Sequence, residues 1–461
     1  MSAPAPRGLE LGAFRRVHVV GIGGAGMSAI ASVLVALGHQ VSGSDLKESP
    51  AMQRLRAAGV EVAVGHDALH VAGAALVVVS SAVRDDNPEV VEARRRAIPV
   101  ASRAEVLAAL AARRRCIAVA GTHGKTTTTS MLSLVLVEAG MAPSFLIGGD
   151  VNEIGTNAVW DEGEWLVLEA DESDGTFLQL APELAVVTNV EPDHLDHYGD
   201  VGRLRAAFER FCTGPRLLVA GADDPQAAAL GRRHGGMLVG TEPDARFRIV
   251  GLDSSREGIV FDLVEDGERV AHLALPVPGA HNARNAALAA VAARAIGAPF
   301  AAAERALARF AGVARRFEFR GEANGVRFVD DYAHLPAEVA ATVRAARDGG
   351  WGRVVAVFQP HRFTRTAALG ESFGPAFAGA DVVIVTDVYA AGEAPVPGVS
   401  GRVVADAVAR ANPGLAVSYV ASRAELAAHV AGVLRPGDLC LTMGAGDVTT
   451  LPDELLRSPS W

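Results

Sequence analysis

The sequence has few aromatic residues, no long apolar run and no excess of positive charge. No apolar run approaches the roughly 20 residues that a membrane-spanning helix needs, and the N-terminal segment MSAPAPRGLELG lacks the apolar core of a signal peptide. The net charge of −10 argues against a nucleic-acid groove or a membrane-surface role. We therefore expect a cytoplasmic protein with neither nucleic-acid nor membrane partners.

Cysteine is also scarce. Cys116, Cys212 and Cys440 are odd in number, far apart and without the spacing of a metal site. We expect reduced, packed thiols, which is typical of a protein in a reducing compartment.

Lysine is almost absent. Of 43 basic residues only Lys47 and Lys125 are lysines, and the rest are arginines. A lysine that persists against such a bias indicates a task that arginine cannot perform. Lys125 lies in the clearest motif of the chain, described below.

The length of 461 residues is too great for a single core and predicts several domains. Short apolar runs typical of buried strands alternate with helical segments, which is the rhythm of parallel α/β sheets. The rhythm restarts before residue 116 and again after residue 316. We predict three α/β domains at residues 1–113, 114–313 and 314–461.

The first glycine cluster, at residues 21–26, follows a predicted strand and opens a predicted helix. It matches the G-x-G-x-x-G pattern, in which bare backbone and a helix N-terminus receive a diphosphate. Asp45 closes the next strand, where a ribose-binding acid is expected. The pattern predicts a Rossmann-like domain that binds a dinucleotide or a nucleotide-diphosphate sugar. It does not separate NAD from a UDP-sugar, and a tight turn without a ligand is the alternative.

The second cluster predicts a phosphate loop. It lies between the predicted strand 116–120 and a predicted helix that runs to about Glu138. Backbone N–H groups would surround ATP phosphates, Lys125 would reach the β- and γ-phosphate oxygens, and the Thr126 hydroxyl would hold Mg²⁺. Val119 occupies the first glycine position of the full motif, so a chance turn is the alternative. The residues of the predicted loop are Gly121, Thr122, His123, Gly124, Lys125, Thr126 and Thr127.

Acidic residues follow two further predicted strands. EADESD (169–174) follows strand 165–168, and NVEPDHLDH (189–197) follows strand 184–188. Carboxylates at the carboxyl ends of sheet strands beside a phosphate loop are natural Mg²⁺ ligands. Solvated surface loops are the alternative for each segment alone.

Together these motifs resemble the Mur ligase family, over nearly the whole chain. The matching segments are GIGGAGMS (21–28), SSAVRDDNPE (80–89), GTHGKTTT (121–128), EADESD (169–174), EPDHLDHY (191–198), HNARNA (281–286), RRF (315–317), DDY (330–332), FQPHRFTRT (358–366) and YAAGE (389–393). The resemblance implies an N-terminal Rossmann-like domain, a central ATPase-like domain and a C-terminal Rossmann-like domain that closes on ATP and the amino acid.

The resemblance also implies an activity. The sequence most resembles the members that use ATP and Mg²⁺ to join L-alanine to the carboxylate of UDP-N-acetylmuramate. In those members the reaction passes through an acyl phosphate and belongs to peptidoglycan precursor synthesis. We expect a monomer or weak homodimer.

The resemblance assigns roles to single residues. Those near the UDP-sugar are Gly23, Gly26, Asp45 and Ser80, and Arg362 and Arg365 lie on the amino-acid and muramoyl side. The Mg²⁺ ligands are Thr126, Glu169 and His194. The ATP contacts outside the phosphate loop are His281, Asn285, Arg316 and Asp331. The catalytic residues are Lys125, His194, Arg316, His334 and His361.

The sequence departs from the family pattern at Leu335, which replaces the second histidine after Asp330-Asp331-Tyr332. This puts a catalytic role of that second histidine in doubt. Sister ligases that add later residues commonly use a carbamylated lysine, which this chain cannot supply because Lys47 is its only lysine outside the phosphate loop. That absence favours the alanine-adding members.

Three alternative functions stay open. One is a recycling ligase of the same family that attaches a ready-made tripeptide. Another is an NAD-linked oxidoreductase or a nucleotide sensor that uses only the first glycine cluster, which would leave Lys125 unexplained. The third is a non-enzymatic binding protein, in which the predicted Mg²⁺ ligands and arginines would have no joint purpose.

Overall fold

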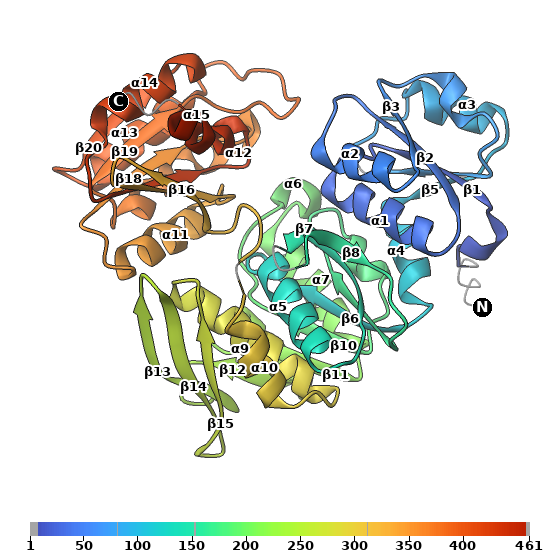
Figure 1. Cartoon of the computed structure of the whole chain (residues 1–461), viewed down its shortest axis with the longest axis horizontal. Helices are drawn as coiled ribbons and strands as arrows, with labels where there is room; N and C mark the ends of the chain where they lie inside the picture. The colour runs from blue at the N-terminus through green and yellow to red at the C-terminus, as the bar shows by residue number, and fades with distance from the viewer. Residues whose placement is uncertain (1–7, 81, 152–153, 311, 458–461) are drawn as a thin grey trace. The chain divides into compact units, whose positions relative to one another are not determined.

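The structure is a computed structural model that describes residues 8–80, 82–151, 154–310 and 312–457. It divides into two compact units, one of residues 1–250, 263–271 and 284–307 and the other of residues 251–262, 272–283 and 308–461. Strands form three sheets within residues 16–102, 115–275 and 318–443, drawn in Figure 1 from blue through green to red. The chain is therefore a three-domain α/β protein, as the sequence predicts. The domain boundaries near residues 113 and 313 stay predictions.

The first sheet is parallel and has the strand order β3-β2-β1-β4-β5. The strand order reverses at β1, and in such sheets ligands bind at the carboxyl ends of the strands beside the reversal. The strands are β1 (Arg16–Val20), β2 (Gln40–Asp45), β3 (Glu61–Val64), β4 (Leu76–Val79) and β5 (Val100–Ser102), and the helices are α1 (Ala25–Ala36), α2 (Pro50–Ala57) and α3 (Pro88–Arg95).

A buried carboxylate ties the parts of this domain together. Glu89 of α3 is fully buried and accepts a hydrogen bond of 2.7 Å from the Ser44 hydroxyl of β2. The Nδ1 atoms of His66 and His70 lie 2.9 Å and 2.7 Å from its oxygens, and Nε2 of His18 lies 3.6 Å away. Burial acts to raise the Glu89 pKa, but the interactions with His18, Ser44 and His70 outweigh burial and lower the pKa to about 2. The domain core thus contains an ionised carboxylate.

The second sheet has ten strands and places β6 in its middle. Its order is β15-β14-β13-β12-β11-β10-β6-β9-β7-β8. The strands are β6 (Arg115–Ala120), β7 (Ser144–Val151), β8 (Thr156–Val159), β9 (Trp165–Glu169), β10 (Leu184–Val187), β11 (Leu217–Gly221), β12 (Met237–Gly240), β13 (Phe247–Ser255), β14 (Gly258–Glu265) and β15 (Glu268–Leu275). Because β9 and β10 both pair in parallel with β6, the acidic segments that follow them start at the same sheet edge as the loop after β6.

Helices α5 (Lys125–Glu138), α9 (Ala280–Ala295) and α10 (Phe300–Leu307) belong to this central region (Figure 1). Residues 126–136 of α5 are buried, so this is a core helix although its first turns are rich in threonine. The Thr129, Ser130 and Ser133 hydroxyls donate to backbone carbonyls of the preceding turn. Its last turn is joined to α10 by an ion pair of 2.7 Å between Glu138 and Arg305.

The third sheet has the order β16-β17-β21-β18-β19-β20, parallel except for the β16–β17 pair. Phe358 packs against Phe373 and Phe377, with ring centroids 5.0 Å and 5.6 Å apart. The elements are β16 (Glu318–Ala323), β17 (Val326–Asp331), β18 (Arg353–Phe358), β19 (Val382–Thr386), β20 (Ala416–Val420), β21 (Asp438–Met443), α11 (Pro336–Asp348), α12 (Phe363–Leu369), α13 (Gly401–Ala411), α14 (Arg423–Val433) and α15 (Leu451–Arg457).

The strands predicted at residues 116–120, 165–168 and 184–188 are present as β6, β9 and β10, each with one bound shifted by one residue. Residues 247–275 form the three successive strands β13, β14 and β15. Within the described ranges, no helix combines the length and apolarity needed to cross a bilayer. All three cysteines are buried and free, as the sequence indicates.

Candidate active site

The loop after β6 has the backbone of a phosphate loop. Gly121 and Gly124 have φ values of +139° and +79°, which favour glycine. A Cβ atom at Gly121 would overlap the Thr188 hydroxyl, and one at Gly124 would lie 2.5 Å from Oδ1 of Asn285. Both positions therefore require glycine for conformation and for space. The loop opens directly into the N-terminus of α5, where backbone N–H groups and the helix dipole favour an anion.

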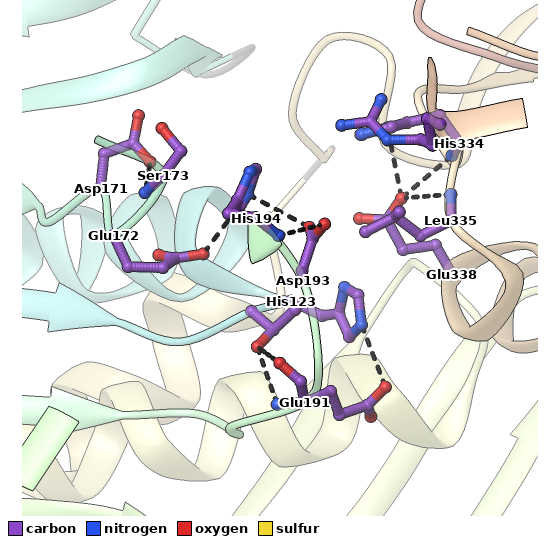
Figure 2. Close-up of polar contacts among 12 residues, drawn as sticks. His123, Asp171, Glu172, Ser173, Glu191, Asp193, His194, His334, Leu335 and Glu338 are labelled. Atoms are coloured by element: carbon purple, nitrogen blue, oxygen red, sulfur yellow. Dashed lines mark hydrogen bonds and ion pairs between the residues drawn. The ribbon is translucent and has the colours of Figure 1, made fainter. Parts of the chain in front are cut away.

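The segment after β10 holds the phosphate loop in place. The Asn189 side chain accepts a bond of 2.8 Å from the His123 N–H and donates one of 3.0 Å to the His123 carbonyl. The Thr188 hydroxyl donates to the same carbonyl at 2.6 Å, and the Thr122 N–H donates to the Asn189 carbonyl at 3.1 Å. Nε2 of His123 also lies 3.3 Å from Glu191 (Figure 2). The loop is thus preorganised by residues that lie about 65 positions later in the chain.

Lys125 is largely buried and its ammonium is shared between the loop and an acidic neighbour. Nζ donates to the Gly121 carbonyl at 2.6 Å and lies 2.8 Å from Oε1 of Glu172. Burial opposes the charge of Lys125, but the carboxylates of Glu172 and Asp171 outweigh it and raise the Lys125 pKa. The lysine is therefore charged at neutral pH, as neutralisation of phosphate requires.

Two of the three predicted Mg²⁺ ligands lie together. The Thr126 hydroxyl donates to Oε1 of Glu169 at 3.0 Å, and the Gly148 N–H donates to Oε2 of Glu169 at 2.6 Å. Mg²⁺ binds through one or two carboxylates, waters and substrate phosphates, so this set of oxygen atoms fits the ion. Among the described residues, no three His, Cys, Asp or Glu side chains converge in the way a metal site built from protein alone requires.

The third predicted ligand, His194, lies against other carboxylates. Its Nε2 is 3.1 Å from Asp193 and 3.9 Å from Glu172, the residue that also contacts Lys125 (Figure 2). His194 has a φ of +52°, a strained conformation that is enriched at functional sites. The side chain of Asp196, from the same acidic segment, lies outside the described part. The structure brings His194 to the phosphate loop, while its role as a Mg²⁺ ligand stays a prediction.

Helix α9 carries the predicted nucleotide contacts. Asn285 lies against Gly124 of the phosphate loop, as the close approach of its amide oxygen shows. His281 precedes it by one turn of the same helix. Arg284, next to Asn285, forms an ion pair with Asp223, which fixes this part of the helix to the loop after β11.

The glycine loop of the first domain is held by the residues predicted for it. The Gly23 N–H donates to Oδ2 of Asp45 at 2.9 Å. Gly21 has a φ of +80°, and a Cβ there would lie 3.2 Å from the Ser80 hydroxyl. Gly26 lies in the first turn of α1. The structure therefore gathers Gly23, Gly26, Asp45 and Ser80 around one helix N-terminus.

Three residues that shape these sites have roles that the sequence alone did not predict. Asn189 holds the phosphate loop, Gly148 leaves room for Glu169, and Arg103 covers Gly26. Asn189 could have been found because it follows a buried strand beside β6. Arg103 gives no local signal, since it is one arginine of an Ala/Arg-rich helix, α4 (Arg103–Ala111).

The second unit contains the other predicted nucleotide residues. Asp331 is buried at the end of β17 and accepts bonds from the Phe317 and Ala333 N–H groups at 2.8 Å and 2.7 Å. Burial raises the pKa of Asp331 to about 6, against the opposing charge of Arg316. The Arg316 guanidinium lies over the Tyr332 ring, 5.3 Å from its centroid. Arg316 and Asp331 are thus neighbours, while their roles as ATP contacts stay predictions.

A partly buried ion pair supports the turn that carries Arg316. Arg315, with a φ of +61°, places Nε 3.3 Å from Oδ2 of the fully buried Asp330 and donates to the Gly444 carbonyl at 2.6 Å. Asp330 also accepts from the Thr442 and Thr449 hydroxyls at 2.7 Å and 2.6 Å. These bonds hold the strained turn in one conformation.

His361 and its neighbours form a group in the same unit. The His361 ring stacks on Tyr389, with centroids 5.8 Å apart and planes at 11°. Nη1 of Arg365 lies 3.1 Å from His361 Nδ1, and Arg362 has a φ of +68°. Burial, with the positive charges of neighbouring residues, lowers the His361 pKa to about 4. Near pH 7, His361 is therefore neutral and the two arginines supply the positive charge.

His334 lies beside this group, 5.9 Å from His361 between ring centroids. Its Nδ1 is 3.0 Å from the Tyr332 carbonyl and 3.3 Å from Glu338, and burial lowers its pKa. The N–H groups of His334 and Leu335 both donate to Glu338 (Figure 2). The Leu335 side chain is buried, so it packs as an apolar residue where the family pattern has histidine.

The structure has a glycine loop beside the reversal point of one sheet and a phosphate loop beside the acidic strand ends of another. Together these two loops define a multidomain nucleotide-using enzyme. In order, its domains match the Mur ligase family catalytic domain at residues 16–115, the Mur ligase middle domain at 119–293 and the Mur ligase glutamate ligase domain at 315–446. The chain belongs to the Mur ligase family.

Individual relatives agree with this assignment. A UDP-N-acetylmuramate–L-alanine ligase from Kineococcus radiotolerans is 51% identical over 453 residues, 96% of each chain. One from Saccharopolyspora erythraea is 49% identical and covers 96% of this chain and 92% of its own. The crystal structure of a UDP-N-acetylmuramate–alanine ligase from Thermotoga maritima superimposes with a TM-score of 0.85 at 31% identity, covering 96% of this chain and 99% of its own. A murein peptide ligase from Psychrobacter arcticus gives 0.71 at 26% identity, with 96% and 98% covered.

Proposed function

We propose that this chain is an ATP-dependent ligase that joins L-alanine to the carboxylate of UDP-N-acetylmuramate in peptidoglycan precursor synthesis. The observation that carries the proposal is similarity over 96% of the chain to ligases of that name. The preformed phosphate loop and the residues around it supply the groups that such a reaction needs. Because the reaction consumes ATP and a nucleotide sugar, we place it in the cytoplasm.

The first step converts a poor acylating agent into a good one. A carboxylate oxygen of the substrate attacks the γ-phosphorus of ATP, the bond from that phosphorus to the bridging oxygen breaks, and an acyl phosphate and ADP form. Phosphoryl transfer asks the protein mainly for positioning and charge neutralisation. Lys125 of the phosphate loop and Arg316 are the positive groups proposed for this task. Mg²⁺ held by Thr126 and Glu169, with His194 as a further proposed ligand, would neutralise additional phosphate charge.

The second step forms the amide. The amino group of alanine attacks the acyl carbon, its excess protons pass to the surroundings, and phosphate leaves. Alanine presents a carboxylate, which the guanidinium groups of Arg362 and Arg365 are suited to bind. These arginines supply the positive charge here, since the neighbouring His361 is neutral near pH 7. His334, which lies beside His361, is proposed to act in the same step. Asn285, His281 and Asp331 are proposed to contact the nucleotide of ATP.

Release of ADP by the purified protein tests the proposal directly. It should require both UDP-N-acetylmuramate and a small L-amino acid, with L-alanine fastest in a panel that includes serine and glycine. Faster turnover with L-Ala-γ-D-Glu-meso-diaminopimelate than with alanine would overturn the proposal in favour of a tripeptide-adding ligase. ADP release that does not depend on the nucleotide sugar would overturn both.

A further inference from the structure

Arg103 is the first residue of α4 and lies at the carboxyl edge of the first sheet, where the glycine loop also lies. Its guanidinium covers Gly26. A Cβ atom built on Gly26 would lie 3.0 Å from Nε, 3.2 Å from Cζ and 3.3 Å from Nη2 of Arg103. Gly26 is therefore small because an arginine side chain occupies the space above the first turn of α1.

The first turn of α1 offers donors for an anion. Gly24 precedes the helix and supplies no side-chain cap, whereas the Ser28 N–H is the first to bond back to the Gly24 carbonyl. The N–H groups of residues 25–27 thus face the space in front of the helix, as in other diphosphate sites. Arg103 adds a permanent positive charge and planar donors to this position.

The hydrogen bonds of Arg103 are incomplete. Its Nε is buried without a hydrogen-bond partner among the described residues. Its Nη1 lies 3.5 Å from Oδ2 of Asp171, which is long for a hydrogen bond, and the pair is about a quarter exposed. Such a pair contributes little stability and is easily exchanged for a stronger partner. Asp171 belongs to the acidic segment whose next residue, Glu172, contacts Lys125.

We propose that Arg103 is a positioning residue that binds the diphosphate of the nucleotide sugar. Its ion pair with Asp171 breaks when the diphosphate binds. A diphosphate in front of α1 would offer oxygens at fixed spacing to the guanidinium, which bonds such oxygens in pairs. The exchange connects the two sites, because Asp171 lies in the segment that holds the phosphate-loop lysine.

This inference rests on the proposed function, and a binding experiment separates the two. Calorimetric titration would measure the affinity of the full chain for UDP-N-acetylmuramate and for UDP, with a non-hydrolysable ATP analogue as the comparison ligand.

Arg103→Ala should weaken binding of both uridine ligands roughly 10- to 100-fold, the loss expected for a charge-assisted bond to phosphate. Arg103→Lys should fall between the parent and Arg103→Ala. Binding of the ATP analogue should stay within about threefold. The matched control is Arg113→Ala, an exposed arginine just beyond α4, which should bind like the parent.

Asp171→Asn gives a second and opposite prediction. Loss of the competing carboxylate should tighten UDP binding a few-fold, an effect that a merely structural arginine would not produce. In the Arg103→Ala background the same substitution should have little effect. The Asp171→Asn experiment remains decisive even if Arg103→Ala unfolds at a lower temperature, because the Asp171→Asn variant keeps Arg103.

Three outcomes would decide against the inference. If the parent protein bound neither uridine ligand, the proposed function would fail and this inference with it. If the parent bound them and Arg103→Ala bound them equally well, only the inference would fail. If Asp171→Asn left UDP affinity unchanged or weakened it, the proposed exchange of partners would be wrong.

Discussion

The ammonium of Lys125 lies 2.8 Å from a carboxylate oxygen of Glu172, a residue that is almost completely buried. The second oxygen of Glu172 has no hydrogen-bond partner within the described ranges. Burial raises the Glu172 pKa, and the charge of Lys125 opposes that shift. A compact ammonium fits between this carboxylate and the Gly121 carbonyl, and a planar guanidinium would not.

The first prediction follows from that fit. Lys125→Arg keeps the charge but should lower turnover on the order of a hundredfold, about 3 kcal/mol of transition-state stabilisation. Steady-state ADP release measures the rate, and affinity for UDP-N-acetylmuramate should barely change. Lys47→Arg, at the exposed second lysine, is the control and should be nearly silent. Turnover within threefold of the parent for both variants would show that position 125 needs only a positive charge.

The second prediction concerns the Arg315–Asp330 pair. Asp330→Asn would weaken the support of the strained turn that carries Arg316. Because misplacement by about 1 Å can cost a hundredfold in rate, we expect kcat/KM for ATP to fall roughly 10- to 100-fold. The KM for UDP-N-acetylmuramate should stay unchanged. Arg315→Lys should give a smaller fall, and an unaltered kcat/KM for ATP in both variants would contradict the positioning role.

The third prediction concerns acid stability. The Glu89 pKa is lowered to about 2 from an ordinary 4.5, so its contribution to stability is present above pH 4.5 and is lost as pH falls toward 2. Glu89→Gln should therefore remove about 3 kcal/mol near pH 7 and flatten the stability change between pH 4.5 and 2. Acid unfolding followed by circular dichroism measures this. The exposed Glu61→Gln serves as a control, and coincident acid transitions for parent and Glu89→Gln would refute the prediction.

The fourth prediction concerns Leu335. Leu335→His restores the family pattern but places an imidazole in a buried apolar position, so we expect a stability loss of about 1 to 3 kcal/mol. Turnover should stay within a few-fold of the parent, because His334 already lies beside His361 and Glu338. Thermal unfolding and ADP release test the two parts. A rise in turnover of a hundredfold or more would instead show that this chain is a weakened member of its family.

The sequence by itself determined the α/β architecture and the two glycine loops. Buried parallel strands such as 184–187 read as continuous apolar runs because both faces are covered, and the loops could be predicted because their residues are contiguous. Short strands with partly exposed residues, such as β3 and β20, were not predicted because they lack that signal.

Only the tertiary structure decided which distant residues complete the site. Glu172 reaches Lys125 across 47 positions, Asn189 holds His123 across 66, and Arg103 covers Gly26. These contacts depend on strand order, since β9 and β10 flank β6 and so bring their carboxyl ends to one edge of the sheet. Hydrophobic periodicity sets which face of a strand is buried, but it does not state which strand lies next to it. The identity of each partner therefore emerges only when the sheet is assembled.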